Sequence, residues 1–196
     1  MDLFTTYIQR DKDEKIADEV FEPSKLILSK VSPDDRYKYG KTSFYENDIW
    51  NDYNEKFQPL YNFIYKNAFD YCKKLQILNV DKIAIDTIWV SEMYKYGQHK
   101  VHGHAGYCDL SGNFYVHTEP NSADIIFHRY EFVNDPNGNF NFSEYNKYNS
   151  NEWRFPAEKG SILIWKSDLP HSVDLNMSDS RIAISFNLRI IVNDRK

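Results

Sequence analysis

The chain has 196 residues, which is a usual length for one domain, and we expect a single domain over 1–196. Its formal net charge is −5, from 24 Lys and Arg against 29 Asp and Glu, which disfavours binding of nucleic acid over an extended basic face. Aromatic residues make up 16% of the chain, and this supply of apolar side chains excludes an intrinsically disordered protein.

We find no targeting signal and no C-x-x-C motif in the sequence. No apolar stretch reaches the roughly 18 residues that a membrane-spanning helix needs, so we expect no membrane segment. The first residues lack the basic and apolar regions of a secretory signal, and we expect a cytoplasmic location. Cys72 and Cys108 are therefore expected to remain thiols.

The first half of the chain predicts one supporting helix. Residues 1–50 are polar and are interrupted by Pro23 and Pro33, which indicates a loosely structured N-terminal extension. Between Phe57 and Leu75 the apolar residues recur with the period of a helix that buries one face, and we expect a supporting helix over residues 52–78. Pro59 fits such a helix only near its first turn.

The second half of the chain predicts strands. Runs of β-branched and aromatic residues, bounded by turn residues, cover 82–94, 112–117, 124–133, 161–165 and 181–191. Because no long helical pattern separates them, they favour an antiparallel sandwich or barrel with its core over residues 80–192.

The histidines indicate a metal site within this β-rich half. His102 and His104 form an H-x-H pair, and side chains two residues apart on a strand leave the same face, so both imidazoles can reach one cation. His171 follows the predicted strand 161–165. By contrast, His99, His117 and His128 are expected to be structural or superficial, and the spacing of His117 and His128 matches no ligand pattern.

Arg181 begins an otherwise apolar strand and needs an anionic partner, because an unpaired buried guanidinium is costly. The partner is either an acid of the chain, such as Asp168 or Asp174, or the carboxylate of a ligand.

These residues together resemble a known family. The order is His102-x-His104, the segment Leu110–Val116, the strand Gly160–Trp165, His171, and Arg181 ten residues later. It resembles the iron(II)- and 2-oxoglutarate-dependent oxygenases, in particular small phage- and bacteria-associated ones, over about residues 82–190. The resemblance implies a double-stranded β-helix (jelly roll, cupin-like) of about eight strands with supporting N-terminal helices.

The resemblance also implies the ligands of the iron. Members of the family hold iron(II) with two histidines and one carboxylate. Here His102 and His171 match the two histidines, but His104 stands where the carboxylate is expected. Either His104 completes the site, which we favour, or Asp109 supplies the carboxylate. Three neutral imidazoles would leave the iron with a charge of +2 instead of +1.

The cosubstrate site follows from the same resemblance. Arg181 matches the residue that binds the far carboxylate of 2-oxoglutarate, and Tyr115 and Ser185 are candidates for a helping hydroxyl. Ala183 stands where related enzymes often have serine. Asn187 shares the facing of Arg181 on its strand and is expected to line the pocket.

The function implied is that of a dioxygenase, and a hydroxylase is the expected type. It would oxidise a C–H bond of a small molecule or peptide and release succinate and CO₂. Two alternatives stay open: a three-histidine, cupin-like dioxygenase that does not use 2-oxoglutarate, and a non-catalytic jelly-roll binding module. Neither a membrane nor a nucleic acid is the expected partner, and the oligomeric state stays open, with a homodimer as one alternative.

Overall fold

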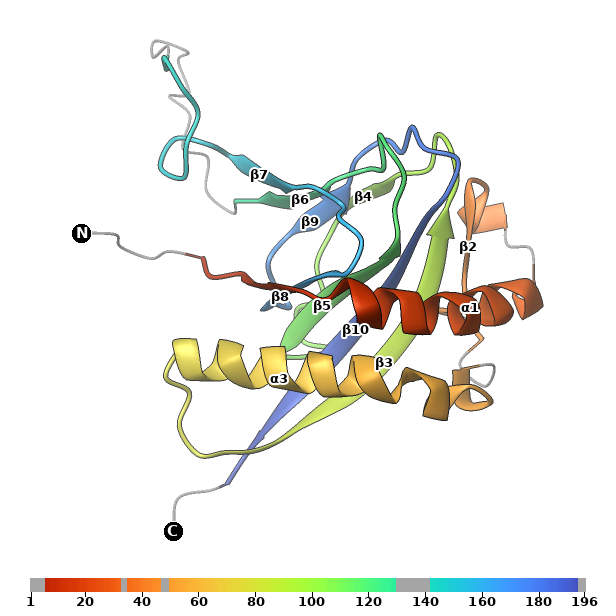
Figure 1. The fold of residues 1–196 in the computed structure, drawn as a ribbon. Helices are drawn as coiled ribbons and strands as arrows, with labels where there is room; N and C mark the ends of the chain where they lie inside the picture. Colours follow the sequence, from red (N-terminus) through yellow and green to blue (C-terminus); the bar gives the residue numbers. More distant parts are fainter. Residues whose placement is uncertain (1–5, 33–34, 47–49, 130–141, 194–196) are drawn as a thin grey trace.

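A computed structural model describes residues 6–32, 35–46, 50–129 and 142–193. Two long helices, α1 (Glu14–Lys30) and α3 (Gln58–Lys74), are accompanied by the short 3₁₀ helices η1 (Asp35–Tyr37) and η2 (Asn54–Phe57). Figure 1 labels every strand except β1, and the strands are β1 (Gln9–Lys12), β2 (Gly40–Thr42), β3 (Val80–Met93), β4 (His99–His102), β5 (Leu110–His117), β6 (Ile125–His128), β7 (Glu152–Phe155), β8 (Ser161–Lys166), β9 (His171–Val173) and β10 (Arg181–Val192).

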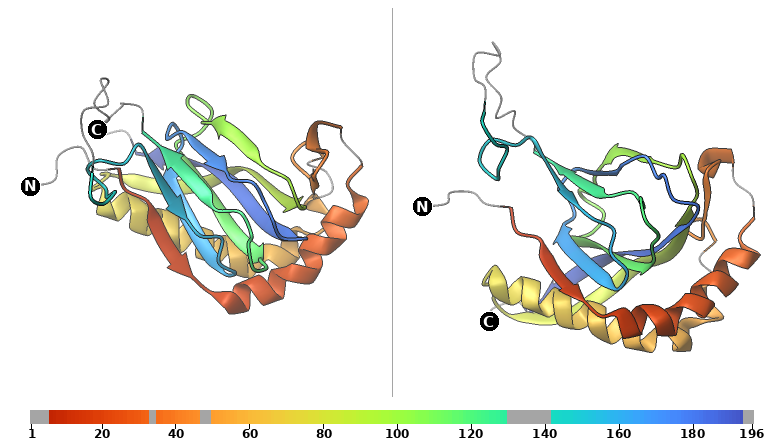
Figure 2. Two further views of the ribbon diagram at one scale, coloured as in Figure 1. Left: turned by 90° about the horizontal axis from the view of Figure 1, so that it is seen from above. Right: turned by 45° about the horizontal axis from the view of Figure 1, so that its top comes forward.

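The strands form two antiparallel sheets that face one another (Figure 2, right). The larger sheet has the order β1-β8-β5-β10-β3-β2, and the smaller has the order β4-β9-β6-β7. This is the predicted mainly β, jelly-roll class of fold. The described strands number ten instead of about eight, because β1 and β2 from the N-terminal part extend the larger sheet at both edges.

The two faces of β10 have different neighbours. Ile184 and Phe186 belong to the core between the larger sheet and the helices, whereas Ala183 packs with residues of the opposite face. Because side chains alternate along a strand, Arg181 and Asn187 share the facing of Ala183 and point between the two sheets. The helices thus cover the outer face of the larger sheet, and the inner face carries the polar residues.

The predicted supporting helix is found as α3, with narrower bounds than the expected 52–78. The helix covers Gln58–Lys74, and Pro59 lies in its first turn, where its missing N–H costs no hydrogen bond. Its buried residues repeat with the helical period and contact the larger sheet.

The expectation of a loosely structured extension over residues 1–50 is wrong for the residues described. Asp13 caps α1 by accepting hydrogen bonds from the N–H groups of Lys15 and Ile16, and Pro23 lies inside the helix. An interior proline costs about 3 kcal/mol. Burial of apolar side chains such as Val20 and Ile27, each at about 1.5–3 kcal/mol, offsets that cost.

The predicted strands are found with adjusted bounds. The prediction over 124–133 was too long at its start, since β6 begins at Ile125, and residues 130–133 lie outside the described part. β4, β7 and β9 were not predicted, because each has only three or four residues and therefore shows little periodicity. The core also extends beyond the predicted 80–192, since β1 pairs with β8 and β2 with β3.

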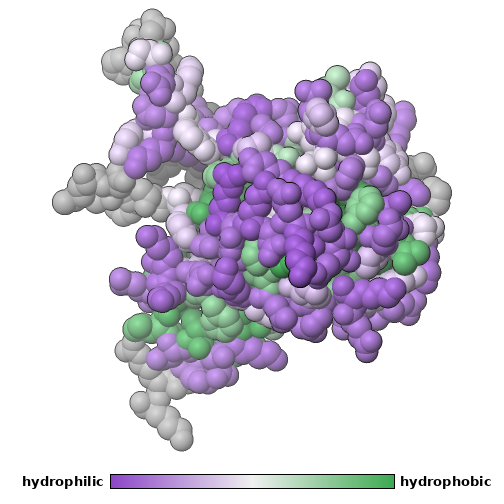
Figure 3. All heavy atoms as spheres, viewed as in Figure 1, coloured by the Kyte–Doolittle hydropathy of each residue, from purple (hydrophilic) through white to green (hydrophobic). Residues whose placement is uncertain are grey.

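The surface seen in Figure 3 is mainly hydrophilic over α1 and α3, and its apolar residues gather near the C-terminal end of α3, where Leu75 and Leu78 are exposed. Among the described helices, none combines the length and the apolar character that crossing a membrane requires. Both cysteines are buried free thiols, as expected.

Candidate metal centre

Three histidines meet at one end of the smaller sheet. His102 ends β4 and is paired in register with His171, which begins β9, while His104 follows β4 in a loop. The loop is fixed because the N–H of His104 donates to the carbonyl of Ser167 at 2.7 Å. One ring nitrogen from each histidine lies within 4.8 Å of the other two, a spacing that allows all three to hold one metal ion. The structure therefore brings together the three histidines that the sequence singled out.

The hydrogen bonds of the rings leave the same nitrogen free on each histidine. Nδ1 of His102 lies 2.8 Å from the carbonyl oxygen of Lys100, and Nδ1 of His171 lies 3.0 Å from that of Leu169. A carbonyl only accepts, so each Nδ1 carries the proton and each Nε2 keeps its lone pair. Histidines that bind metals usually have this arrangement, in which the far ring nitrogen donates to a carbonyl or carboxylate.

His104 is held by side chains of the larger sheet instead of a carbonyl. Its Nδ1 lies 2.8 Å from Oδ1 of Asn187, whose amide nitrogen donates to the hydroxyl of Thr87 at 2.8 Å. The hydroxyl of Ser111 donates to the same Oδ1 at 2.9 Å. Asn187 faces inward and borders the large cavity, as expected, but its amide is already bonded to these three residues. It thus orients His104.

Burial keeps two of the three rings, those of His104 and His171, in the neutral form that binds metals. The pKa of His171 falls to about 3, mainly because burial penalises the charged form, and burial also lowers the pKa of His104. These two histidines therefore do not have to release a proton at neutral pH before they bind a cation.

Asp109, the alternative carboxylate ligand, is used elsewhere. Its Oδ2 accepts a hydrogen bond from the N–H of Ile190 at 2.7 Å, and it is not in the cluster of metal-ligating atoms. The carboxylate therefore fixes the register between the start of β5 and β10, and His104 takes the third position in the cluster.

Arg181 is buried between the sheets with part of its guanidinium unpartnered. Its Nε donates to the carbonyl of Ala123 at 3.0 Å, whereas Nη2 has no hydrogen-bond partner among the described residues. Neither acid weighed as a partner reaches it, since Asp168 pairs with Lys166 and Asp174 with Arg154. A buried charged donor without a partner indicates that a ligand supplies the acceptor.

Tyr115 lies beside Arg181 and is also unpartnered. The guanidinium carbon stands 4.9 Å from the centre of the Tyr115 ring, and the buried hydroxyl has no hydrogen-bond partner among the described residues. Ser185, the other candidate for a helping hydroxyl, donates to Oδ1 of Asn113 at 3.4 Å. Of the two, Tyr115 has the hydroxyl with free capacity.

A large cavity of about 820 Å³ opens beside the histidines. Its lining includes His102 and His104, and it also includes His99, whose ring makes an edge contact with His102 at 6.0 Å. Burial is the main cause that lowers the pKa of His99 to about 4, and repulsion from the charges of His102 and Arg181 lowers it further. His99 therefore borders the cavity without belonging to the cluster of three histidines.

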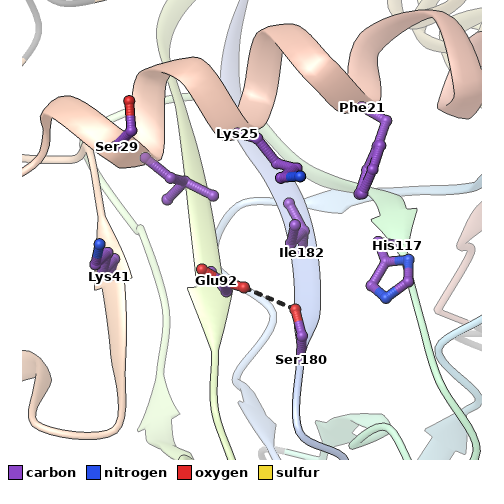
Figure 4. A pocket seen from close by; sticks show the side chains of 9 residues that line it. Phe21, Lys25, Ser29, Lys41, Glu92, His117, Ser180 and Ile182 are labelled. Carbon is purple, nitrogen blue, oxygen red and sulfur yellow. Dashed lines mark hydrogen bonds between the residues drawn. The ribbon is translucent and has the colours of Figure 1, made fainter.

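The other two histidines lie apart from the cluster, as expected. His128 contacts the hydroxyl of Ser172 at 2.8 Å, and His117 lies 3.6 Å from Glu119. A smaller cavity of about 240 Å³ lies near His117 between α1 and the larger sheet (Figure 4), where the hydroxyl of Ser180 donates to Glu92 at 2.8 Å. None of the three clustered histidines lines it.

Comparison with known families gives one match. Residues 87–187, slightly more than half of the chain, match the family described as "Putative 2OG-Fe(II) oxygenase". No sequence among the curated proteins matches the chain.

Solved structures of similar fold include a prolyl-4-hydroxylase and an alpha ketoglutarate dependent epimerase. A prolyl-4-hydroxylase from Pseudomonas putida is 11% identical over 95% of this chain and 94% of that one, with a TM-score of 0.58. The epimerase SnoN, solved with Fe³⁺, alpha ketoglutarate and nogalamycin RO, is 10% identical over 94% of this chain and 79% of that one, with a TM-score of 0.60. This chain spans only 53% of the length of a 2OG-Fe(II) oxygenase family oxidoreductase from Burkholderia pseudomallei, which is 11% identical over 64% of this chain with a TM-score of 0.47.

Proposed function

Because this chain belongs to the 2OG-Fe(II) oxygenase family, and is therefore an oxidoreductase that uses iron and 2-oxoglutarate, we propose that it hydroxylates a C–H bond of a small molecule or peptide. His102, His104 and His171 would hold the iron, and Arg181 with Tyr115 would hold 2-oxoglutarate. The reaction would release succinate and CO₂ while one oxygen atom of O₂ enters the substrate.

The donor set fits a divalent iron. Imidazole is a good ligand for this metal, and each ring presents an Nε2 lone pair while its Nδ1 is hydrogen-bonded. The set departs from two histidines and a carboxylate, so the centre would keep a charge of +2. A more positive centre attracts an anionic cosubstrate more strongly, in line with the family assignment.

The observation that carries the proposal is the unpartnered Nη2 of buried Arg181 next to the unpartnered hydroxyl of Tyr115. Burial raises the pKa of Tyr115, so its hydroxyl stays protonated and can donate. Two donors without acceptors fit one carboxylate, as at the far end of 2-oxoglutarate. A three-histidine dioxygenase without 2-oxoglutarate would leave both donors without a role.

The chain's own part in the reaction is to bind and to orient. Iron with 2-oxoglutarate supplies the oxidation when bound. Arg181 and Tyr115 would fix the far carboxylate, and Asn187 would keep the ring of His104 in its ligating orientation. The apolar residues between the sheets, such as Trp165 and Phe127, exclude water from this region.

Anaerobic titration tests the proposal. Fe(II) is added first and 2-oxoglutarate second, and the weak visible charge-transfer band of the chelate is recorded. Admission of O₂ should then give succinate. Folded protein that shows neither the band nor succinate contradicts the proposal. Iron binding without any effect of 2-oxoglutarate would favour the three-histidine alternative.

A further inference from the structure

The segment over residues 36–45 forms one wall of the large cavity and lies outside the family match over 87–187. This wall includes Tyr37, Lys38 and Phe44, while His102 and His104 line the same cavity. A substrate that enters beside the metal centre therefore meets side chains that the family match does not account for. The cavity volume of about 820 Å³ is in the usual range for a small-molecule site.

The wall is fixed on the edge of the larger sheet. β2 pairs with the end of β3, where Gly40 lies opposite Met93. A Cβ at Gly40 would stand only 2.9 Å from the ring of Tyr37, so the glycine allows this close approach. The hydroxyl of Ser91 donates to Thr42 at 2.9 Å, which ties the wall to β3. Side chains held in this way can select among substrates.

The charge of the cavity differs from that of the whole chain. Four basic residues and one acid line it, although the net charge of the chain is −5. The acid, Asp86, is bonded to Arg189 at 2.9 Å. Lys38 and Lys100 are exposed, and neither has an ion pair with any residue of the described ranges. The excess of positive charge favours an anionic ligand.

The cavity is also bordered by aromatic rings with free faces or edges. Phe44 is 42% exposed and contacts Trp89 edge to face, with ring centres 4.9 Å apart. Tyr45 stands against Phe44 at 5.0 Å, and the guanidinium of Arg36 lies over its ring at 4.0 Å. Exposed apolar rings gathered at a cavity mark a binding surface, and flat aromatic ligands stack on such rings.

We propose that this cavity binds a small anionic molecule that carries a flat aromatic ring. The ring packs against Phe44 and Trp89, and the anionic group lies near Lys38 and Lys100. The inference that this molecule is the substrate rests on the proposed function, because only then does the cavity hold the group that is oxidised.

The test uses three probes on the full chain, with and without Fe(II) under argon. 1-Naphthyl phosphate carries both features, 1-naphthol only the ring, and inorganic phosphate only the charge. We expect naphthyl phosphate to bind at least about 10-fold more tightly than either of the others, since stacking and charge add. Calorimetry gives each affinity. Equal affinity of inorganic phosphate and naphthyl phosphate would overturn the proposal.

Variants separate the two features. F44A should weaken naphthyl phosphate about 10-fold and leave inorganic phosphate unchanged. K38A/K100A should weaken both anions about 5-fold, and this loss should shrink at high salt. The matched control is K73A/K74A on the last turn of α3, away from the cavity lining. A K38A/K100A protein that binds as tightly as this control contradicts the proposal.

The same protein preparations distinguish the proposed class of ligand from the proposed oxygenase function. Protein that binds iron and 2-oxoglutarate but shows no preference for naphthyl phosphate contradicts only the substrate class. Protein that prefers naphthyl phosphate but binds no iron contradicts only the proposed oxygenase site.

Discussion

Nδ1 of His104 donates a hydrogen bond of 2.8 Å to Oδ1 of Asn187, and this contact joins the cluster of histidines to β10, an inner strand of the larger sheet. The two residues are 83 positions apart in the sequence. The bond fixes which ring nitrogen of His104 faces the other two histidines. Asn187 is therefore a positioning residue for the proposed metal ligand.

Replacing Asn187 with alanine should weaken metal binding by about 10- to 100-fold, as for other residues that orient ligands. Anaerobic calorimetry with Fe(II) measures the affinity. S185A is the matched control, since Ser185 lies on the same face of the same strand and its hydroxyl bonds to Asn113 instead of to any of the three histidines. Equal affinities of the two variants would show that Asn187 does not position His104.

The pair H104A and D109N tests the choice of the third ligand. H104A should lose most of its Fe(II) affinity. D109N should keep it, because Asp109 accepts a hydrogen bond from the N–H of Ile190, and an asparagine oxygen can still accept it. The opposite result, with iron lost in D109N and kept in H104A, would assign the carboxylate to the metal.

Replacing Arg181 with lysine should weaken 2-oxoglutarate binding by about 10- to 100-fold, since a hydrogen bond between charged groups contributes about 1.5–3 kcal/mol. Lysine keeps the charge but loses the fork of nitrogens. The Fe(II) affinity should change little, because Arg181 is not one of the proposed metal ligands. A titration of the charge-transfer band against 2-oxoglutarate measures the effect, and an unchanged midpoint would contradict the assignment.

Neighbouring residues of α1 test whether the N-terminal helix belongs to the core. I27A should lower the free energy of unfolding by about 2–5 kcal/mol, since Ile27 is fully buried. L26A should lower it by less than about 1 kcal/mol, since Leu26 is 43% exposed. Urea unfolding measures both. Similar values for the two variants would mean that α1 is only loosely attached.

Glu119 should make stability depend on pH in the acid range. Its Oε2 accepts hydrogen bonds from the N–H groups of Asp179 and Ser180, directly before Arg181, and the bond from Ser180 is the main cause of its lowered pKa. The stabilisation is complete above the unfolded pKa of 4.5 and is lost as the pH falls through the lower folded value.

E119Q should therefore show a smaller loss of stability than the parent protein as the pH falls below about 4.5, the carboxyl's ordinary pKa. Thermal unfolding at a series of pH values measures this. E22Q is the control, because Glu22 is exposed and accepts no such backbone bonds within the described ranges. Parallel curves for E119Q and the parent would rule out this role.

Periodicity in the sequence was sufficient for α3 and for the longer strands. The period of apolar residues between Phe57 and Leu75 reflects one buried face, and the β-branched runs reflect strands with many neighbours. Polarity and proline content were misleading over residues 1–50, because burial of α1 against the larger sheet outweighs the local cost of Pro23. Periodicity gave no signal for β9, whose three residues are too few to show a period.

Composition, spacing and residue type alone determined much of this protein: a globular β-rich chain, an H-x-H pair with a distal histidine, and an arginine in need of an anion. These follow from the sequence because they depend on local periodicity and on the chemistry of single side chains. Only the tertiary structure decided that His104 joins the cluster while Asp109 bonds to β10, and that residues 36–45 border the same cavity. Those relationships depend on the pairing of strands far apart in the chain, and the register of that pairing is set by the packing of the whole core.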